Sequence, residues 1–582
     1  MERTRVGLSL KTIGLKLSLL GAAIWASAGT AQAQVPCLPG LDVQCVDQGK
    51  GWTNATRKDF YSRDQGSQMI PYAWAKALKT SDGQPFMWDG FARYGYLDDP
   101  FRQGLPVGFT VAGTGQNAQL GMNCAACHTR EIRRGNLTYR IDGGPAIVDF
   151  QGLLTDMVNA VGDVLNDQAK WKSFYGAVLG PFPSNAKIAA LRSQVEIWYE
   201  RENTMKQRAF GTPDMWGLGR LDAVAMIFNR VTGLDLGPPP TYLIADNIEP
   251  ADAPVRYPFL WNAAKQDKTQ WPGFADNGTS VAGLARNAGE VFGVFGVVHP
   301  VSPSPRIGNV NFTQINSMNG WGLLALENLI KKIGTPKWPA HFPINQTLVE
   351  QGKPLYETNC GTCHGVKPGK PGFPNIPTWH TPLQDVGTDS REYEVMARTA
   401  DPGVLINLKS ALDPSFKVTN PSKSFDLLKY VVIGSVVQKG TVLLALGEDF
   451  LNSPGFTSGK TMTKAQQLAE SSFTLPQFDG TFKYESRVMF GVWAAAPYLH
   501  NGSVATLWDL LLPANQRPVS FAVGPVYDPV NLGLAANQPG SYVRTTTGCD
   551  QRNSGNSRCG HEFGVNLTVP QKRALLEYMK TL

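Results

Sequence analysis

The apolar positions of the chain follow a helical period in three stretches. In residues 188–204 the shared face carries Leu191, Val195, Trp198 and Tyr199. In residues 345–358 Leu348, Leu355 and Tyr356 share a face, although Pro354 disturbs the pattern. Near the C-terminus Thr568 and Gln571 form a capping box, and the face behind them carries Leu575, Tyr578 and Leu582. Each stretch predicts a helix.

Strand patterns are short and scattered. The clearest is residues 291–298 (VFGVFGVV), a β-branched and aromatic run interrupted by two glycines, which predicts a strand. The 60 glycines and 41 prolines indicate many ordered loops. No period of about 20 to 50 residues repeats along the chain. The expected fold class is therefore mainly α, with long loops and minor β.

The N-terminus has the pattern of an export signal. Basic residues precede an apolar run at 17–28, and Ala31 to Ala33 fit a small-x-small cleavage site, so residues 1–33 are predicted to be a signal peptide. The apolar run is shorter than the roughly 20 residues that span a bilayer, and no later segment is long enough either. We expect a periplasmic or secreted protein without stable membrane insertion.

The charge pattern argues against nucleic acid as a partner. The formal net charge is +7, but lysine and arginine occur only in short pairs such as Arg133-Arg134 and Lys331-Lys332. A nucleic-acid surface needs a basic patch or stripe, which this pattern does not predict.

Two CxxCH motifs carry the chemistry. They are Cys124-Ala-Ala-Cys127-His128 and Cys360-Gly-Thr-Cys363-His364. Two thiols on a turn that enters a helix reach the two vinyl groups of one porphyrin, and the histidine that follows ligates the iron. A structural zinc would need four ligands, which neither motif supplies alone. The sequence therefore predicts two covalently bound haem c groups.

The other four cysteines fall into two short-range pairs. In an oxidising compartment the simplest pairing is Cys37 with Cys45 and Cys549 with Cys559. Free buried thiols are the alternative.

The distance between the motifs predicts one domain for each haem. The two cytochrome c-like domains are expected at 111–345 and 346–582, after an extension at 34–110. Residues 335–343 contain three prolines and are expected to form the linker. The helix at 345–358 then corresponds to the opening helix of a class I cytochrome c fold.

The sixth iron ligand decides what each haem does, because a six-coordinate iron transfers electrons and an open face binds oxygen or peroxide. The remaining histidines are His299, His341, His380, His500 and His561. Methionines such as Met489 are further candidates, and spacing alone does not choose among them.

Several segments resemble a known superfamily. Residues 496–507 (APYLHNGSVATL) resemble the PYxHDGS-type segment of the di-haem cytochrome c peroxidase and MauG superfamily, with Asn501 in place of the usual Asp. Five further segments resemble its oxygenase branch, which includes rubber oxygenases and periplasmic fatty-acid oxygenases and hydroperoxide isomerases. They are 219–223 (GRLDA), 259–261 (FLW), 286–295 (RNAGEVFGVF), 517–518 (RP) and 555–564 (GNSRCGHEFG).

The resemblance implies different ligand sets for the two haems. In the oxygenase branch the N-terminal haem has a protein ligand on one side only, which is His128 here, and binds dioxygen. The C-terminal haem has two histidine ligands, here His364 and His561. A peroxidase would more often supply a methionine about fourteen residues after His500, where this chain has Ala514.

The resemblance also suggests roles for residues around the haems. Arg286, Asn287 and Glu290 are candidates for the catalytic neighbourhood of the first haem, with a structural salt bridge as the alternative. His500 is expected in the cofactor environment, bonded to a haem propionate or near the second haem. Trp261 or Trp271 could carry electrons between the haems, although core packing is the default for a tryptophan.

These patterns predict an exported di-haem oxygenase that takes dioxygen and an unsaturated lipid, with a small cytochrome as a candidate electron donor. Oleate-type dioxygenation to a hydroperoxide, or isomerisation of the hydroperoxide to a diol, is the first hypothesis. A rubber (polyisoprene) oxygenase and a di-haem cytochrome c peroxidase are the alternatives. The apolar runs at 224–228 and 291–298 could line the substrate pocket, or could be core.

Overall fold

Most of the long helices of this protein begin at a residue whose side chain caps them. The computed structural model describes residues 37–211, 215–306, 309–369, 377–408, 417–451 and 479–582. Ser184 caps α6 (Asn185–Ala209), which confirms the helix predicted at 188–204 and extends it at both ends. Other long helices are α4 (Phe150–Asn166), α5 (Gln168–Leu179), α8 (Ser280–Gly293), α9 (Gly320–Ile330), α13 (Ser424–Gln438) and α14 (Thr441–Leu451).

Short helices and many small sheets fill the space between the long helices. The short helices are α1 (Asn54–Ser62), α2 (Tyr72–Ala77), α3 (Cys124–Cys127), α7 (Ala223–Phe228), α11 (Gly361–His364), α12 (Arg391–Met396) and α16 (Leu507–Leu510). The two three-stranded sheets have the orders β1-β6-β5 and β2-β4-β3. Their strands are β1 (Gln44–Cys45), β2 (Ile70–Pro71), β3 (Phe109–Ala112), β4 (Gln119–Met122), β5 (Thr129–Arg134) and β6 (Leu137–Asp142).

The remaining strands form two-stranded pairs, all antiparallel. They are β7 (Arg220–Leu221) with β8 (Val255–Arg256), β9 (Lys268–Thr269) with β10 (Ala275–Asp276), β11 (Val298–Val301) with β12 (Asn311–Asn316), β13 (Leu383–Gln384) with β16 (Tyr484–Glu485), β14 (Thr399–Ala400) with β15 (Ser422–Lys423), β17 (Ser520–Ala522) with β20 (Val543–Thr545), and β18 (Tyr527–Asp528) with β19 (Gly533–Leu534). The architecture is thus mixed, and the expectation of a mainly α fold was only partly right. Many of these strands are two residues long and pair with a strand that is distant in the sequence, so no local sequence pattern predicts them.

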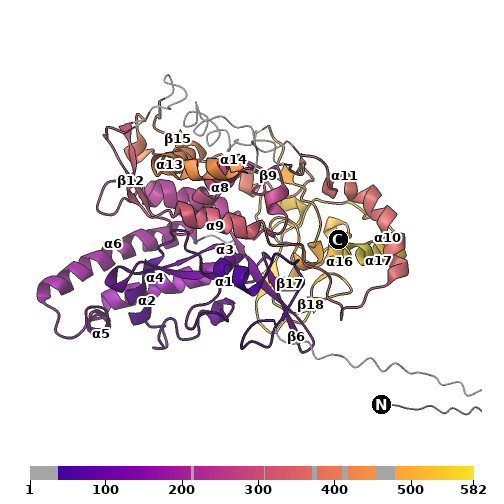
Figure 1. Cartoon of the computed structure of the whole chain (residues 1–582), viewed down its shortest axis with the longest axis horizontal. Helices are drawn as coiled ribbons and strands as arrows, with labels where there is room; N and C mark the ends of the chain where they lie inside the picture. Colours follow the sequence, from indigo (N-terminus) through magenta and orange to yellow (C-terminus); the bar gives the residue numbers. More distant parts are fainter. Residues whose placement is uncertain (1–36, 212–214, 307–308, 370–376, 409–416, 452–478) are drawn as a thin grey trace, which may run out of the picture. The chain divides into compact units, whose positions relative to one another are not determined.

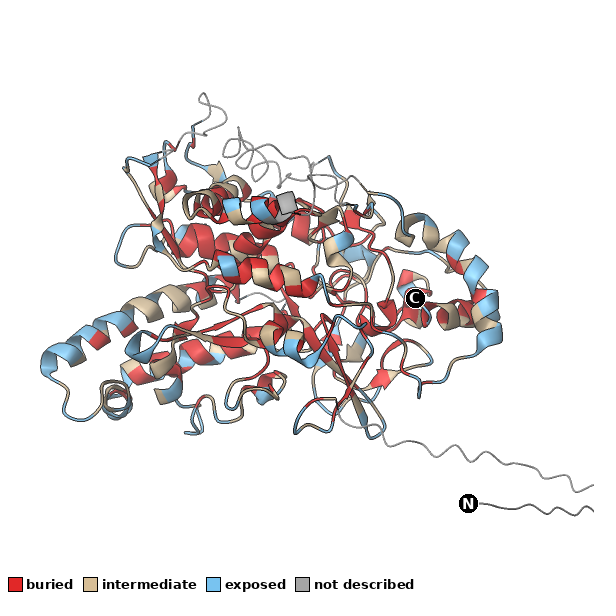
Figure 2. Cartoon of the chain, viewed as in Figure 1, coloured by how far each residue is buried: buried red, intermediate tan, exposed pale blue. Residues whose placement is uncertain are grey.

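The strand predicted at residues 291–298 was wrong. Thr279 caps α8, and this helix continues through Gly293 before the chain turns at Phe295, whose φ is 69°. A strand begins only at Val298. Burial of the start of this run as part of a helix outweighs its local preference for a strand, because α8 is buried on nearly all sides, as Figure 2 shows.

A pair of helices flanks the second CxxCH motif. Asn345 caps α10 (Gln346–Asn359), which contains Pro354, and the capping box of Thr568 and Gln571 opens α17 (Val569–Met579), as the sequence predicts. The two helices pack together (Figure 1). Their approach is close at Gly352, where an added Cβ would lie 2.0 Å from the backbone oxygen of Ala574.

The described residues belong to one compact unit, Pro36–Leu582. Residues 335–343 carry neither helix nor strand in this described part of the chain, and the domain boundary at 345/346 stays a prediction. Both predicted disulfides are present, Cys37–Cys45 and Cys549–Cys559. The predicted signal peptide lies outside the described residues. Within the described ranges, no helix combines the length and the apolar character needed to cross a bilayer.

Candidate haem sites

The first CxxCH motif is held by its own cap. Asn123 precedes α3; its side chain accepts a hydrogen bond from Ala125 N (2.9 Å) and donates to Phe60 O (2.9 Å). His128 follows the helix and its Nδ1 donates to the carbonyl oxygen of Pro258 (2.8 Å), which leaves Nε2 as the nitrogen for a metal. Burial lowers the pKa of His128 to about 4, so the ring is neutral, as a ligand must be.

The second motif repeats this arrangement at the end of α10. Cys360 ends α10 and leads into α11, whose last residue is His364. The Nδ1 of His364 donates to the carbonyl oxygen of Arg487 (2.7 Å). Burial raises the pKa of Cys360 to about 12, and that of Cys127 to about 12 in the first motif. Unlike the other two cysteine pairs, the cysteines of the two motifs form no disulfide.

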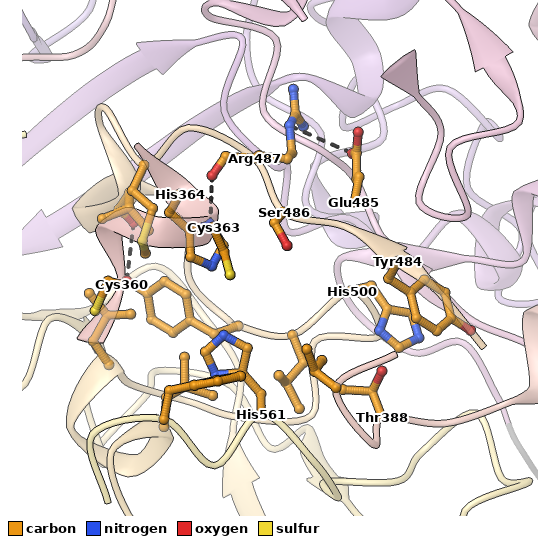
Figure 3. A pocket seen from close by; sticks show the side chains of 18 of the residues that line it. Cys360, Cys363, His364, Thr388, Tyr484, Glu485, Ser486, Arg487, His500 and His561 are labelled. Carbon is orange, nitrogen blue, oxygen red and sulfur yellow. Dashed lines mark hydrogen bonds and ion pairs between the residues drawn. The ribbon is translucent and has the colours of Figure 1, made fainter. Parts of the chain in front are cut away.

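Each motif opens onto its own cavity. The first cavity comprises about 1280 Å³ of space, part of it open to solvent, and its lining includes Cys124, Cys127 and His128. The second cavity comprises about 1210 Å³, also partly open to solvent, and its lining includes Cys360, Cys363 and His364 (Figure 3). Each lining therefore offers two free thiols and a histidine, which is the donor set that haem c needs.

In the second cavity His561 lies opposite His364. The two ring centroids are 6.1 Å apart (Figure 3). Two metal–nitrogen bonds of about 2.0–2.1 Å, together with the half-widths of two imidazole rings, add up to about this separation. Burial, followed by the charge of His364, lowers the pKa of His561 to about 3, and its Nδ1 has no hydrogen-bond partner among the described residues. The pair fits a six-coordinate haem. Met489 and Met579 also line this cavity.

The backbone around His561 is held from two sides. His561 itself has a φ of 53°, and its N–H donates to Val386 O (2.7 Å). The guanidinium of Arg517 donates to the carbonyl oxygens of Gly560 (2.8 Å) and His561 (3.2 Å). The Cys549–Cys559 disulfide ends two residues before the histidine. A left-handed backbone conformation is unfavourable for histidine. These contacts hold His561 in it.

Removing this disulfide is predicted to loosen the second haem site. Changing Cys549 and Cys559 to serine should lower the free energy of unfolding by about 2–4 kcal/mol, because the unfolded chain gains freedom. The spectrum of the second haem should also lose its six-coordinate form at lower temperature than in the unaltered protein. The matched control is Cys37→Ser with Cys45→Ser, which opens a loop of similar length (sequence separation 8 against 10) and should leave the haem spectrum unchanged. If the two double variants change the haem spectrum equally, the Cys549–Cys559 disulfide does not hold His561 in place.

The described lining of the first cavity holds no histidine other than His128, although it includes Met122 and Met226. Much of the remaining wall is apolar, with Leu221, Met226, Ile227, Val255, Leu260, Val294 and Ile330. Two members of the run at 224–228, Met226 and Ile227, thus line the cavity, whereas Val224 and Phe228 are core. The cavity suits one proximal ligand and an apolar molecule on the other face.

The three candidates on α8 reach this cavity as a polar cluster. Arg286 donates to Glu327 Oε2 (2.5 Å), and Asn287 donates to the same oxygen (3.0 Å). Glu290 accepts from Gln270 Nε2 (2.7 Å). Burial raises the pKa of Glu290, which lines the cavity. Arg286 and Asn287 bond to Glu327, whose pKa is lowered, whereas Glu290 lies 3.9 Å from Arg286 and has a raised pKa. Glu290 is therefore the carboxyl group of this cluster that is better suited to hold a proton.

The pairing of Arg286 with Glu327 predicts a large stability effect. Glu327→Ala should lower the free energy of unfolding by about 3 kcal/mol, because it removes the nearest carboxylate of the buried Arg286 and leaves only Glu290, 3.9 Å away. The control is Glu196→Ala, which breaks an exposed pair with Arg192 and should have little effect. Urea unfolding of both holoproteins measures the difference, and similar losses in the two would refute the assignment.

His500 lines the second cavity and packs against protein groups there. Its Nε2 lies 2.7 Å from Asp389 Oδ2, and its ring stacks on Tyr484 at 3.9 Å. Asn501 donates to the same carboxylate (2.9 Å) and to Ser557 O (2.8 Å). An aspartate at position 501 could make neither contact when ionised, which explains why this chain tolerates the departure from the family segment.

The two tryptophan candidates take different positions. Trp271 lines the second cavity and donates to Arg256 O (3.2 Å). Trp261 lines neither haem cavity; it stacks on Phe259 at 4.8 Å and donates to Phe490 O (2.7 Å). Conduction through either tryptophan stays a prediction.

The sequence did not reveal several residues of the sites. Gln270 and Glu327 lie in the first cavity, and Arg256 and Arg487 line both cavities. Of these residues only Gln270 lies next to a candidate predicted from the sequence, Trp271. The others come together through contacts between distant segments.

Comparison with protein families defines a broad class. Residues 483–522 match a family model described as RoxA-like, cytochrome c-like. The match implies a c-type haem and an oxidoreductase, and supports the broad resemblance to di-haem oxygenases and peroxidases. It contains Arg487, His500 and Arg517 but neither CxxCH motif.

Two curated relatives extend the similarity beyond this segment. The chain is 26% identical over 633 residues to the uncharacterized protein y4iJ of Sinorhizobium fredii (strain NBRC 101917 / NGR234), covering 97% of this chain and 98% of the relative. It is 28% identical over 274 residues to the uncharacterized protein y4iM of the same strain, covering 43% of this chain and 51% of that protein.

Proposed function

We propose that this protein is an exported di-haem c-type oxygenase that acts on an unsaturated hydrocarbon chain at the haem held by His128. The observation that carries the proposal is the asymmetry of the cavities. The second cavity places the rings of His364 and His561 with their centroids 6.1 Å apart, whereas His128 is the only histidine in the described lining of the first. Six-coordinate haem suits electron transfer, and an open face suits oxygen chemistry.

The residues of the first cavity have separate tasks in this proposal. The bond from His128 to Pro258 O fixes the orientation of the ring and makes it a stronger ligand. The apolar wall binds the alkene and excludes water. Glu290, held by Gln270, is placed to hold or deliver a proton. A reduced haem with one open face supplies the oxygen activation.

The second haem serves the first as a source or store of electrons, and a small cytochrome is the proposed external donor. The location is the periplasm or the extracellular space. Two disulfides support it, because disulfides persist in oxidising compartments.

The substrate is proposed to be an oleate-type fatty acid or its hydroperoxide, and one observation favours polyisoprene as a second candidate. A carboxylate inside the cavity would need a cation. Among the described lining residues the cations are Arg256, Arg286 and Arg487, and Arg286 is already paired with Glu327. A neutral polymer needs no such partner, whereas a fatty acid needs either Arg256 or Arg487 for its carboxylate or a carboxylate that stays at the mouth of the cavity.

Oxygen uptake tests the proposal. The holoprotein is supplied in turn with oleate, with polyisoprene latex, and with hydrogen peroxide plus a reduced cytochrome, and the products are analysed by mass. Uptake with oleate supports the first substrate and uptake with latex the second. If the protein turns over only hydrogen peroxide with reduced cytochrome, it is a peroxidase and not an oxygenase.

A further inference from the structure

Four residues line both cavities and form a wall between them. This shared wall consists of Arg256, Phe259, Glu485 and Arg487. Arg256 and Arg487 are almost fully buried, with 7% and 6% of their surface exposed. Two arginines are an unusual choice for the interior, because a buried charge is costly unless it is paired.

One proximal histidine bonds to the shared wall, and the other bonds to the residue next to it in the chain. His128 donates to the carbonyl oxygen of Pro258, the residue before Phe259, and His364 donates to the carbonyl oxygen of Arg487 itself. The guanidinium of Arg487 lies 4.1 Å from the centre of the Phe259 ring. A short chain of contacts therefore joins the ligand of one site to the ligand of the other.

The shared wall carries more positive charge than the surrounding protein groups neutralise. Arg487 has Glu485 at 3.6 Å and donates to Gln266 Oε1 (2.9 Å), and Arg256 donates to Leu499 O (2.9 Å). The Nη1 atoms of both arginines have no hydrogen-bond partner among the described residues. Glu485 is the one carboxylate of the wall, and Gln266 also donates to it (3.2 Å). Unpaired buried donors of this kind call for an anionic acceptor.

Haem carries two propionate groups, and arginine binds carboxylates well. We propose that Arg256 and Arg487 bind propionates of both haems and so set the two reduction potentials together. The inference rests on the two-haem part of the proposed function and not on the substrate. Because a positive charge near iron favours its reduced state, loss of either charge should lower both potentials.

Spectroelectrochemical titration of the holoprotein tests this coupling. The variants are Arg256→Gln and Arg487→Gln, with Arg487→Lys to retain the charge. The control is Arg544→Gln, a buried arginine that lines neither haem cavity and donates to Gly502 O (2.7 Å). Both midpoints are expected to fall in each wall variant with glutamine, to stay nearer the unaltered values with lysine, and to be unmoved in the control.

The outcomes separate this inference from the proposed function. Haem content is measured first, and fewer than two haems in the unaltered protein would refute the proposed function. Two haems of which only one changes potential in both glutamine variants would overturn the shared role alone. If Arg487→Gln loses haem and Arg487→Lys retains it, the result supports binding of the propionates by this arginine. If both variants lose haem, the result overturns the proposed binding.

Discussion

His128→Ala is expected to abolish substrate-dependent oxygen consumption. The change removes the only histidine among the described lining residues of the first cavity, so the iron there loses its protein ligand. The loss should exceed the roughly 10–100-fold effect of changes to groups that only support a ligand. Oxygen-electrode assays with the best substrate measure it, alongside haem content.

The matched control for this prediction is His380→Ala. This histidine lies beside Asp267 with 51% of its side chain exposed and lines neither haem cavity, so its loss should leave the rate unchanged. If the His128 variant keeps the second haem and still turns over substrate, the chemistry does not take place at the first haem.

His561→Ala is expected to convert the second haem from six-coordinate to five-coordinate while the haem stays attached through Cys360 and Cys363. Turnover that depends on an electron donor should fall, because reduction of this haem would be coupled to a change in ligation. His561→Met should restore six-coordination and raise the reduction potential of this haem, since methionine ligation does so in cytochromes.

Optical and EPR spectra of the ferric and reduced variants measure this second prediction. An unchanged spectrum in His561→Ala would show that another side chain ligates the iron, and Met489 and Met579 line the same cavity. The spectrum of the first haem serves as the internal control.

Local chemistry made part of this structure predictable. The CxxCH motifs, the capping box at Thr568 and the two short disulfide loops depend on residues within about ten positions of one another. Such signals survive in the sequence because the backbone brings their members together without help from the rest of the fold.

Contacts between distant segments explain what the sequence could not show. Residues 291–297 have strand propensity but pack as the end of a buried helix and the turn after it. The shared wall joins Arg256 to Arg487, and Glu327 reaches Arg286 from another helix. The placement of His561 opposite His364 was inferred from family resemblance, and the 6.1 Å between the rings supplies the physical reason.

Coordination number is the most direct test of the central claim that one haem is open and the other closed. Optical and EPR spectra of the resting and reduced holoprotein should show two haems, one five-coordinate and one six-coordinate with two histidine ligands. Two haems that are both six-coordinate and remain so on reduction would contradict the oxygenase assignment for either substrate.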